Sequence, residues 1–125
     1  MKLTSIAPQF VVPDVVRAAD YYVAKLGFTN RGYFLDPPVY AIVQRGGAEI
    51  HFGKSDDGTA TRGTQNRKGG LDAYIRVEGL DTLYKELQDR GAKIICAPTV
   101  QVYKMREITV EDLNGFMLAF GEDAS

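Results

Sequence analysis

The sequence predicts an α+β fold in which two βαβββ modules form a curved mixed sheet with the helices outside. Two stretches with helical spacing of apolar residues, near residues 14–27 and 79–91, each follow a strand-like stretch and end at a glycine. The last strands of the two halves also match in kind, since Glu-Ile-His-Phe-Gly at 49–53 lies over Met-Leu-Ala-Phe-Gly at 117–121. Such repetition in the same order indicates a duplicated unit.

The first module, about residues 1–54, is expected to begin with a strand over 3–12, because apolar residues alternate there with polar ones. Asp14 then serves as the N-cap of the first helix. Gly27 ends this helix, because glycine adopts a positive φ without steric cost. Three strands follow, at about 29–35, 39–45 and 48–53.

Residues 54–70 are rich in Gly, Thr, Asp, Asn and basic residues and show no periodicity. We expect a solvated loop here or, because the stretch is long for a compact domain, a lid or a crossover arm. The second module, about residues 71–122, repeats the pattern of the first, with a strand at 71–77 and a helix between Gly79 and Gly91. Its last three strands are expected near 94–102, 105–110 and 116–121.

The two modules can be overlaid by placing Gly27 on Gly91, which also places Phe10-Val11 on Tyr74-Ile75. Two matches in the same order support a duplication. The length of 125 residues and the hydrophobic content of 45% suit one domain with one core. We therefore expect a single domain over residues 1–125.

Alternation along the strands predicts two faces with different roles. The apolar face must pack under the helices, since that burial supplies most of the folding free energy. Its residues are Ile6, Phe10, Val12, Ile50, Phe52, Ala73, Ile75, Val77, Ile108, Val110, Phe116, Leu118 and Phe120. The other face is either an exposed sheet surface or a cleft for a small molecule, and its mixture of aromatic and polar groups favours the cleft. Its residues are Ser5, Ala7, Gln9, Glu49, His51, Asp72, Tyr74, Arg76, Tyr103, Met105, Glu107, Thr109, Met117 and Ala119.

Charge and cysteine content exclude several classes of protein. The formal net charge of −1 provides no field that would attract nucleic acid or an anionic membrane. No apolar run approaches the roughly 18 residues that a membrane span needs. Cys96 is the single cysteine, so an intrachain disulfide cannot form. We expect a cytoplasmic protein with no nucleic-acid or membrane partner.

The segment at 103–120, Tyr-Lys-Met-Arg-Glu-Ile-Thr-Val-Glu-Asp-Leu-Asn-Gly-Phe-Met-Leu-Ala-Phe, is similar to the ending of a known family. Its Arg-Glu, acidic turn and Asn-Gly resemble the bleomycin-resistance group of the vicinal oxygen chelate superfamily. The Val-Pro-Asp helix entry and Gly-Gly-Ala-Glu-Ile-His-Phe at 46–52 also look like that group. The resemblance covers nearly the whole chain and implies an open, barrel-like cup and a homodimer.

The resemblance also implies where a metal would bind. Metalloenzymes of this superfamily hold a divalent metal with four cup-lining side chains, and these positions correspond here to Ala7, His51, Asp72 and Ala119. Alanine cannot ligate a metal, and a catalytic site normally needs three protein ligands and an open position. We therefore expect no metal and no cofactor. Because the reactions depend on that metal, we also expect no glyoxalase-type isomerisation, thiol transfer to fosfomycin or extradiol cleavage. Replacement of a missing ligand by Glu49 or Glu107 is the alternative.

The candidate ligand-binding residues are Tyr40, His51, Asp72, Tyr74, Tyr103, Met105 and Glu107. The tyrosines could stack on a flat or cationic ligand, or they could fill a dimer interface. His51 could contact a ligand, exchange protons or play a structural role. Asp72 and Glu107 could act as an acid/base pair, or Arg76 could neutralise them. The sequence shows no Ser-His-Asp or Cys-His arrangement and no phosphate-binding glycine motif.

These residues favour a metal-free, dimeric binding protein of the bleomycin-resistance type. Its partner would be a bulky aromatic or cationic small molecule, held in a cleft between modules, and protection by sequestration would require no chemistry. One alternative is a vicinal-oxygen-chelate enzyme of the lyase, isomerase or dioxygenase type. Such an enzyme would have a displaced metal site or acid/base chemistry on His51, Asp72 and Glu107. The other alternative is a structural or regulatory dimer.

Overall fold

The computed structural model describes residues 1–60, 62 and 68–125, and this part of the chain forms two βαβββ modules. The first module contains β1 (Gln9–Val12), α1 (Val15–Leu26), β2 (Thr29–Phe34), β3 (Tyr40–Arg45) and β4 (Ala48–Lys54). The second contains β5 (Ala73–Arg76), α2 (Leu80–Arg90), β6 (Lys93–Val100), β7 (Met105–Glu111) and β8 (Met117–Asp123). The predicted α+β class and the order of elements are confirmed.

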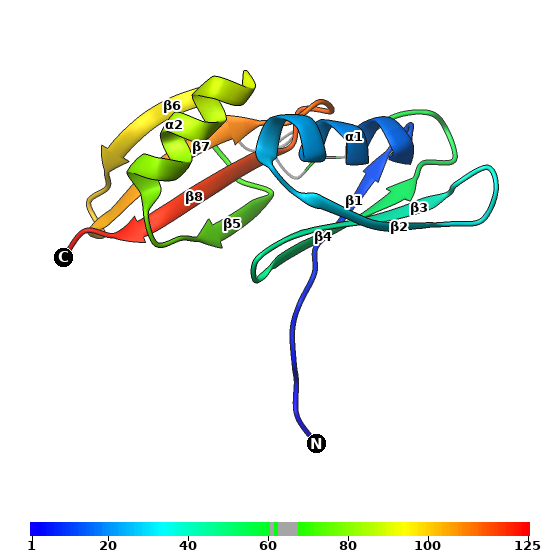
Figure 1. The fold of residues 1–125 in the computed structure, drawn as a ribbon, viewed down its shortest axis with the longest axis horizontal. Coiled ribbons are helices and arrows are strands. Elements are labelled where there is room, and N and C mark those ends of the chain that lie inside the picture. The colour runs from blue at the N-terminus through cyan, green and yellow to red at the C-terminus, as the bar shows by residue number, and fades with distance from the viewer. Residues whose placement is uncertain (61, 63–67) are drawn as a thin grey trace.

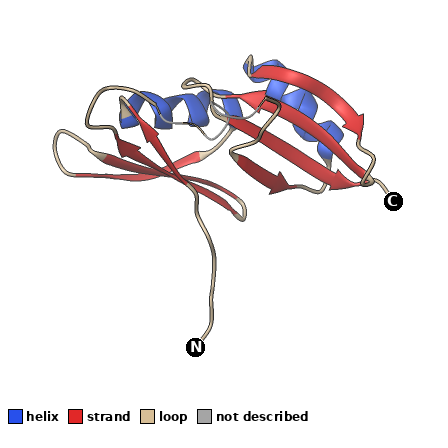
Figure 2. Cartoon of the chain, turned by 180° about the vertical axis from the view of Figure 1, so that it is seen from behind, coloured by secondary structure: helices blue, strands red, loops and turns tan. Residues whose placement is uncertain are grey.

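The strands form two four-stranded mixed sheets that lie side by side (Figure 1). The N-terminal sheet has the order β1-β4-β3-β2, and the C-terminal sheet has the order β5-β8-β7-β6. In each sheet the first strand runs parallel to the last, while the other pairs are antiparallel. Both helices cover the same side of the sheets, as Figure 2 shows from behind, and α1 packs against α2. The helices therefore lie outside, as expected.

The first strand is shorter than the sequence predicts. It was expected over residues 3–12, but β1 begins at Gln9, and Ile6 is 89% exposed instead of buried in the core. Pro8 has no N–H to donate to the strand ladder. Pairing with β4 begins at the carbonyl of Pro8, which accepts the His51 N–H at 3.0 Å. The preceding residues extend away from the body of the protein (Figure 1).

Strand register corrects the overlay of the two modules by one residue. In the parallel pairs, Gln9 lies opposite His51 and Tyr74 lies opposite Ala119. His51 and Ala119 occupy matching positions in the last strands, so Tyr74 corresponds to Gln9 rather than to Phe10. The helix-closing glycines are a poor reference for β1 and β5, because α1 has 12 residues and α2 has 11.

The helix ends follow the capping chemistry expected from the sequence. The Asp14 side chain accepts the backbone N–H groups of Val16 at 3.0 Å and Arg17 at 3.1 Å. Gly27 and Gly91 end their helices with φ of 74° and 76°, values that residues other than glycine rarely adopt. Within the described residues, neither helix has the length and apolar character needed to cross a lipid bilayer.

The core is continuous between the two modules. The rings of Phe10 and Phe116 stack with centroids 4.2 Å apart. Tyr22 of α1 is buried, and its hydroxyl donates to the Asp112 carboxylate, in the turn after β7, at 2.8 Å. Apart from Ile6, every residue of the predicted apolar face belongs to this core or packs against it. Burial raises the pKa of Asp112.

The predicted loop at 54–70 is described only in part. Lys54 still belongs to β4, and residues 61 and 63–67 lie outside the described residues. Arg62 donates to the carbonyl of Asn114 at 3.0 Å, which attaches this part of the connection to the turn between β7 and β8. The expectation of a lid or crossover arm also concerns residues 61 and 63–67 and stays a prediction.

Candidate functional site

Two polar clusters lie on the sheet faces opposite the helices, one on each sheet. On β4, Ile50 and Phe52 are buried under the helices, so the alternation of the strand turns Glu49 and His51 to the opposite face. On β7, Ile108 is buried in the core, and Glu107 faces the other way. The candidate residues therefore occupy two half-sites on different sheets.

The cluster on the N-terminal sheet is a line of four hydrogen-bonded side chains, Gln9, Tyr40, His51 and Glu49. The Tyr40 hydroxyl lies 2.7 Å from His51 Nδ1, and His51 Nε2 lies 2.7 Å from a carboxylate oxygen of Glu49. Gln9 donates to the Tyr40 hydroxyl at 3.2 Å. The His51 and Glu49 side chains are 24% and 38% exposed, so the cluster is accessible from solvent.

The cluster on the C-terminal sheet surrounds Glu107, which is only 6% exposed. The Tyr103 hydroxyl lies 2.7 and 2.6 Å from the two carboxylate oxygens of Glu107. The Glu107 carboxylate also raises the pKa of the Tyr74 hydroxyl. In the described part of the chain, no basic side chain forms an ion pair with Glu107. The structure thus contains a buried carboxylate whose side-chain partners are neutral hydroxyl groups.

The tyrosines of this cluster are held in their protonated form. Partial burial, followed by the hydrogen bond and the negative charge of Glu107, raises the pKa of Tyr74 to about 12. The hydrogen bond to Glu107 is also the main cause that raises the pKa of Tyr103. Both hydroxyl groups therefore remain hydrogen-bond donors at neutral pH. Tyr103 lies in the turn before β7, which begins at Met105, so the strand alternation that assigned Tyr103 to the polar face does not extend to it.

Gly121 of β8 makes room for Tyr74. A Cβ atom at Gly121 would lie 1.9 Å from the Tyr74 hydroxyl oxygen and 2.5 Å from Cζ, so any side chain here would collide with the phenol. The matching position of the first module is Gly53, where a Cβ would meet Gln9 at 3.6 Å, an ordinary contact. The Phe-Gly ending that repeats in β4 and β8 was the sequence signal for these two positions.

Among the described residues, no hydrogen bond or ion pair joins Asp72 or Met105 to either cluster. The Asp72 carboxylate accepts the Met117 N–H at 2.8 Å, and its own N–H donates to the Met117 carbonyl at 2.8 Å. This pairing fixes the start of the β5–β8 ladder, which is a structural role. Met105 lies on the same face of β7 as Glu107, two residues away. Asp72 and Glu107 thus have different partners, and no carboxylate pair is formed by their described contacts.

A cleft of about 850 Å³ lies between the modules. The turn between β3 and β4 and the side chain of Glu49 form one wall, while β5 and α2 form the other. Of the seven candidate residues, only Tyr74 lines this cleft. Tyr40, His51, Asp72, Tyr103, Met105 and Glu107 lie outside it.

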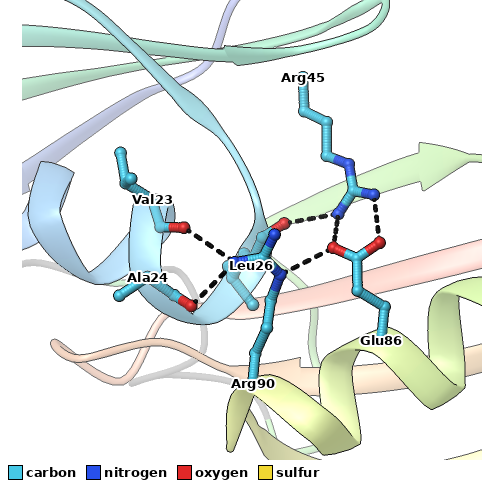
Figure 3. Close-up of polar contacts among 6 residues, drawn as sticks. All are labelled: Val23, Ala24, Leu26, Arg45, Glu86 and Arg90. Atoms are coloured by element: carbon cyan, nitrogen blue, oxygen red, sulfur yellow. Dashed lines mark hydrogen bonds and ion pairs between the residues drawn. The ribbon is translucent and has the colours of Figure 1, made fainter.

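A network of charged side chains joins the modules at the edge of this cleft (Figure 3). Arg45 of β3 makes two hydrogen bonds to Glu86 of α2, at 2.9 and 2.8 Å, and a third to the Leu26 carbonyl at 2.9 Å. Arg90 binds Glu86 at 2.8 Å and the carbonyl of Ala24 at 3.2 Å. Two guanidinium groups therefore meet the negative end of the α1 dipole. Arg45, followed by Arg90, lowers the pKa of Glu86.

The four positions that the family resemblance assigns to a metal do not fit one. Ala7 and Ala119 have no donor atom, and Asp72 caps a strand ladder. Both ring nitrogens of His51 are already hydrogen-bonded to Tyr40 and Glu49. Across residues 1–60, 62 and 68–125, no three His, Cys, Asp or Glu side chains gather as a metal site would require.

Three residues of the clusters were not among the seven candidates. Gln9 and Glu49 complete the line of side chains around Tyr40 and His51, and Gly121 accommodates Tyr74. Gln9 and Glu49 share the polar parity of their strands with His51, but parity alone gives no reason to prefer them. Tyr40 and His51 come together because β3 and β4 are adjacent and antiparallel.

Comparison with known proteins identifies relatives of the fold. Residues 3–120 match the model of the Glyoxalase/Bleomycin resistance protein/Dioxygenase superfamily. No curated protein sequence shows significant similarity to the chain. At these levels of identity, the similarity to the following solved structures concerns the fold alone.

TioX from Micromonospora sp. ML1 aligns with a TM-score of 0.75 and 19% identity, over 96% of this chain and 98% of that chain. A glyoxalase-related enzyme from Clostridium phytofermentans aligns with a TM-score of 0.78 and 18% identity, over 98% and 97%. A member of the glyoxalase/bleomycin resistance protein/dioxygenase superfamily from Sphaerobacter thermophilus DSM 20745 has a TM-score of 0.73 and 22% identity, over 98% of both chains.

Proposed function

Because the chain belongs to the Glyoxalase/Bleomycin resistance protein/Dioxygenase superfamily, we propose that it is a metal-free protein that binds and sequesters a small molecule. The ligand is a bulky compound that combines an aromatic or apolar body with a positive charge. Its site is built around Tyr74, Tyr103 and Glu107. Sequestration requires affinity but no covalent chemistry. It is therefore compatible with side chains that do not form a metal site.

The observation that carries this proposal is the buried carboxylate of Glu107. Taking a carboxylate out of water costs free energy unless a cation or several donors compensate it. Tyr74 and Tyr103 supply donors but no positive charge. A cationic ligand would supply that charge, and the phenol rings would offer it aromatic faces. The same cluster would give a neutral ligand only contact area.

We also propose that two copies of the chain complete the binding site as a homodimer. Each cluster lies on an open sheet face, and among the described residues of one chain only Glu49 of the first cluster and Tyr74 of the second line the cleft between the modules. Leu3 and Ile6 are 88% and 89% exposed on a segment that extends from the body of the protein (Figures 1 and 2). Apolar side chains presented in this way favour burial against a second copy.

Native mass spectrometry of freshly purified protein tests both parts of this proposal, because it reports oligomeric state and retained compounds together. We expect a dimer, with any retained compound lost in Glu107→Gln. Replacing Leu3 and Ile6 together by serine should shift the protein toward the monomer. A wild-type monomer at micromolar concentration would refute the shared site, while stoichiometric bound metal would refute a metal-free function.

Calorimetry then tests the residues of the site, with bleomycin and a panel of aromatic cations as ligands. We expect Tyr103→Ala to weaken binding by about tenfold, the scale of an interface hot spot, with little change in melting temperature. Tyr33→Ala is the matched control, since Tyr33 is an exposed tyrosine of β2 on the other sheet. Equal loss of affinity in both variants would place the site elsewhere.

A further inference from the structure

The hydrogen bonds of the cluster on the N-terminal sheet all run in one direction when His51 is neutral. A carboxylate can only accept, so His51 Nε2 carries the proton that it shares with Glu49 at 2.7 Å. When the imidazole is neutral, its Nδ1 atom has a free lone pair to which the Tyr40 O–H, at 2.7 Å, can donate. The Tyr40 oxygen in turn accepts an N–H of Gln9 at 3.2 Å. Each member therefore orients the next.

This order has no evident role in holding the fold together. The His51 and Glu49 side chains are partly exposed, and Gln9 is exposed. Ordering such side chains at a wet surface costs conformational entropy and contributes little stability. Gly53 lies opposite Tyr40 on the neighbouring strand, next to the Gln9 side chain that reaches the phenol.

We propose that Tyr40, His51 and Glu49 form a nucleophilic triad in which the Tyr40 hydroxyl attacks activated carboxylic esters. The geometry is that of a hydroxyl nucleophile hydrogen-bonded to an imidazole base, which a carboxylate orients. Tyr40 is the nucleophile, His51 is the base and Glu49 is a positioning residue. The site is separate from the Glu107 cluster, so this activity does not depend on the proposed sequestration.

The reaction is an acyl transfer without any redox change. A bond forms between the Tyr40 oxygen and the acyl carbon, while the bond from that carbon to the leaving-group oxygen breaks. The phenolic proton moves to His51 Nδ1, and the resulting imidazolium is paired with Glu49 before it releases the proton to the leaving group or to water. Water then cleaves the aryl ester on Tyr40 and restores the hydroxyl. Gln9 donates to the Tyr40 oxygen and holds it in line throughout.

The test uses p-nitrophenyl acetate as the probe, at neutral pH, with the full-length protein. Release of p-nitrophenol is followed by absorbance, and peptide mass spectrometry locates the acetyl group. We expect one acetyl group on Tyr40 and a release rate that falls about tenfold or more in Tyr40→Phe and in His51→Gln. Glu49→Gln should lower the rate while leaving Tyr40 as the modified residue. Tyr33→Phe should react like the wild type.

Two results would overturn the triad. One is acetylation confined to lysines or the N-terminus, with equal rates in the wild type and Tyr40→Phe. The other is equal acetylation of Tyr40 in the wild type and His51→Gln, which would show an exposed phenol without activation. Circular dichroism and melting temperature identify a variant that has not folded. Tyr40→Phe and Glu49→Gln both keep the size of the side chain, so at least one of them is expected to remain folded.

Discussion

Replacing Gly121 by alanine should remove Tyr74 from the Glu107 cluster without deleting any of its atoms. The new Cβ would lie 1.9 Å from the Tyr74 hydroxyl oxygen, whereas ordinary contact begins at 3.4 Å. The phenol must therefore move by about 1.5 Å, which takes its hydroxyl away from the influence of Glu107. Tyr74 is 40% exposed and can swing toward solvent, so the fold should survive with a change in stability within about 1 kcal/mol.

The direct assay is a titration of tyrosine ionisation by absorbance between neutral and strongly alkaline pH. In the wild type, Tyr74 ionises with a pKa of about 12, because partial burial and Glu107 oppose its negative charge. In Gly121→Ala this pKa should fall toward 10, the ordinary value of tyrosine. Affinity for an aromatic cation should also fall by about fivefold to tenfold.

Gly53→Ala is the matched control for this experiment. It adds the same methyl group at the corresponding position of the other module, where the nearest side-chain atom is 3.6 Å away. We expect no change in the ionisation of Tyr74 and no loss of affinity for the cation. An unchanged titration curve in Gly121→Ala, or the same change in Gly53→Ala, would refute the close packing of Tyr74 against β8.

Three further substitutions test the packing that positions the clusters. Glu86→Gln should lower the free energy of unfolding by about 1 kcal/mol at pH 7, because Glu86 and its arginine partners are partly exposed. The pKa of Glu86 is lowered in the folded state, so its contribution to stability is fully present above pH 4.5 and is lost as the pH falls through its folded pKa. The free energies of unfolding of the wild type and Glu86→Gln, measured in urea, should therefore converge in acid. A difference that stays constant with pH would contradict this. Tyr22→Phe removes a buried donor to Asp112 and should cost about 1–3 kcal/mol in the same assay, whereas no loss would show that this hydrogen bond is not needed. Asp14→Ala should cost about 1 kcal/mol by leaving the first turn of α1 uncapped, and asparagine at this position should restore most of it.

The fold could be predicted from the sequence because its signals are local. Asp14, Gly27 and Gly91 mark helix ends by their own chemistry, and strand alternation identified the core apart from Ile6. The exception arose at Pro8, where a missing N–H ends the ladder although the apolar alternation continues through it. The alternation of side chains does not show which backbone groups are hydrogen-bonded to a neighbouring strand.

The candidate sites could be predicted only in part, because they depend on contacts between strands. Parity placed His51 and Glu107 on the polar face, and the structure confirms that position. It could not show that Tyr40 would reach His51 from the next strand or that a glycine on β8 would hold space for Tyr74. Asp72 has the expected parity, but the first N–H of β8 engages its carboxylate.

The buried carboxylate of Glu107 is expected to select a positive charge in the ligand. The most direct measurement compares the affinities of 4-(trimethylammonio)benzyl alcohol and its neutral isostere 4-tert-butylbenzyl alcohol, by calorimetry, for the wild type and Glu107→Gln. Glu49→Gln, on the other sheet, serves as the control for loss of a negative charge. We expect the wild type and Glu49→Gln to prefer the cation by about tenfold or more, and Glu107→Gln to lose this preference. An equal preference in Glu107→Gln, or none in the wild type, would contradict it.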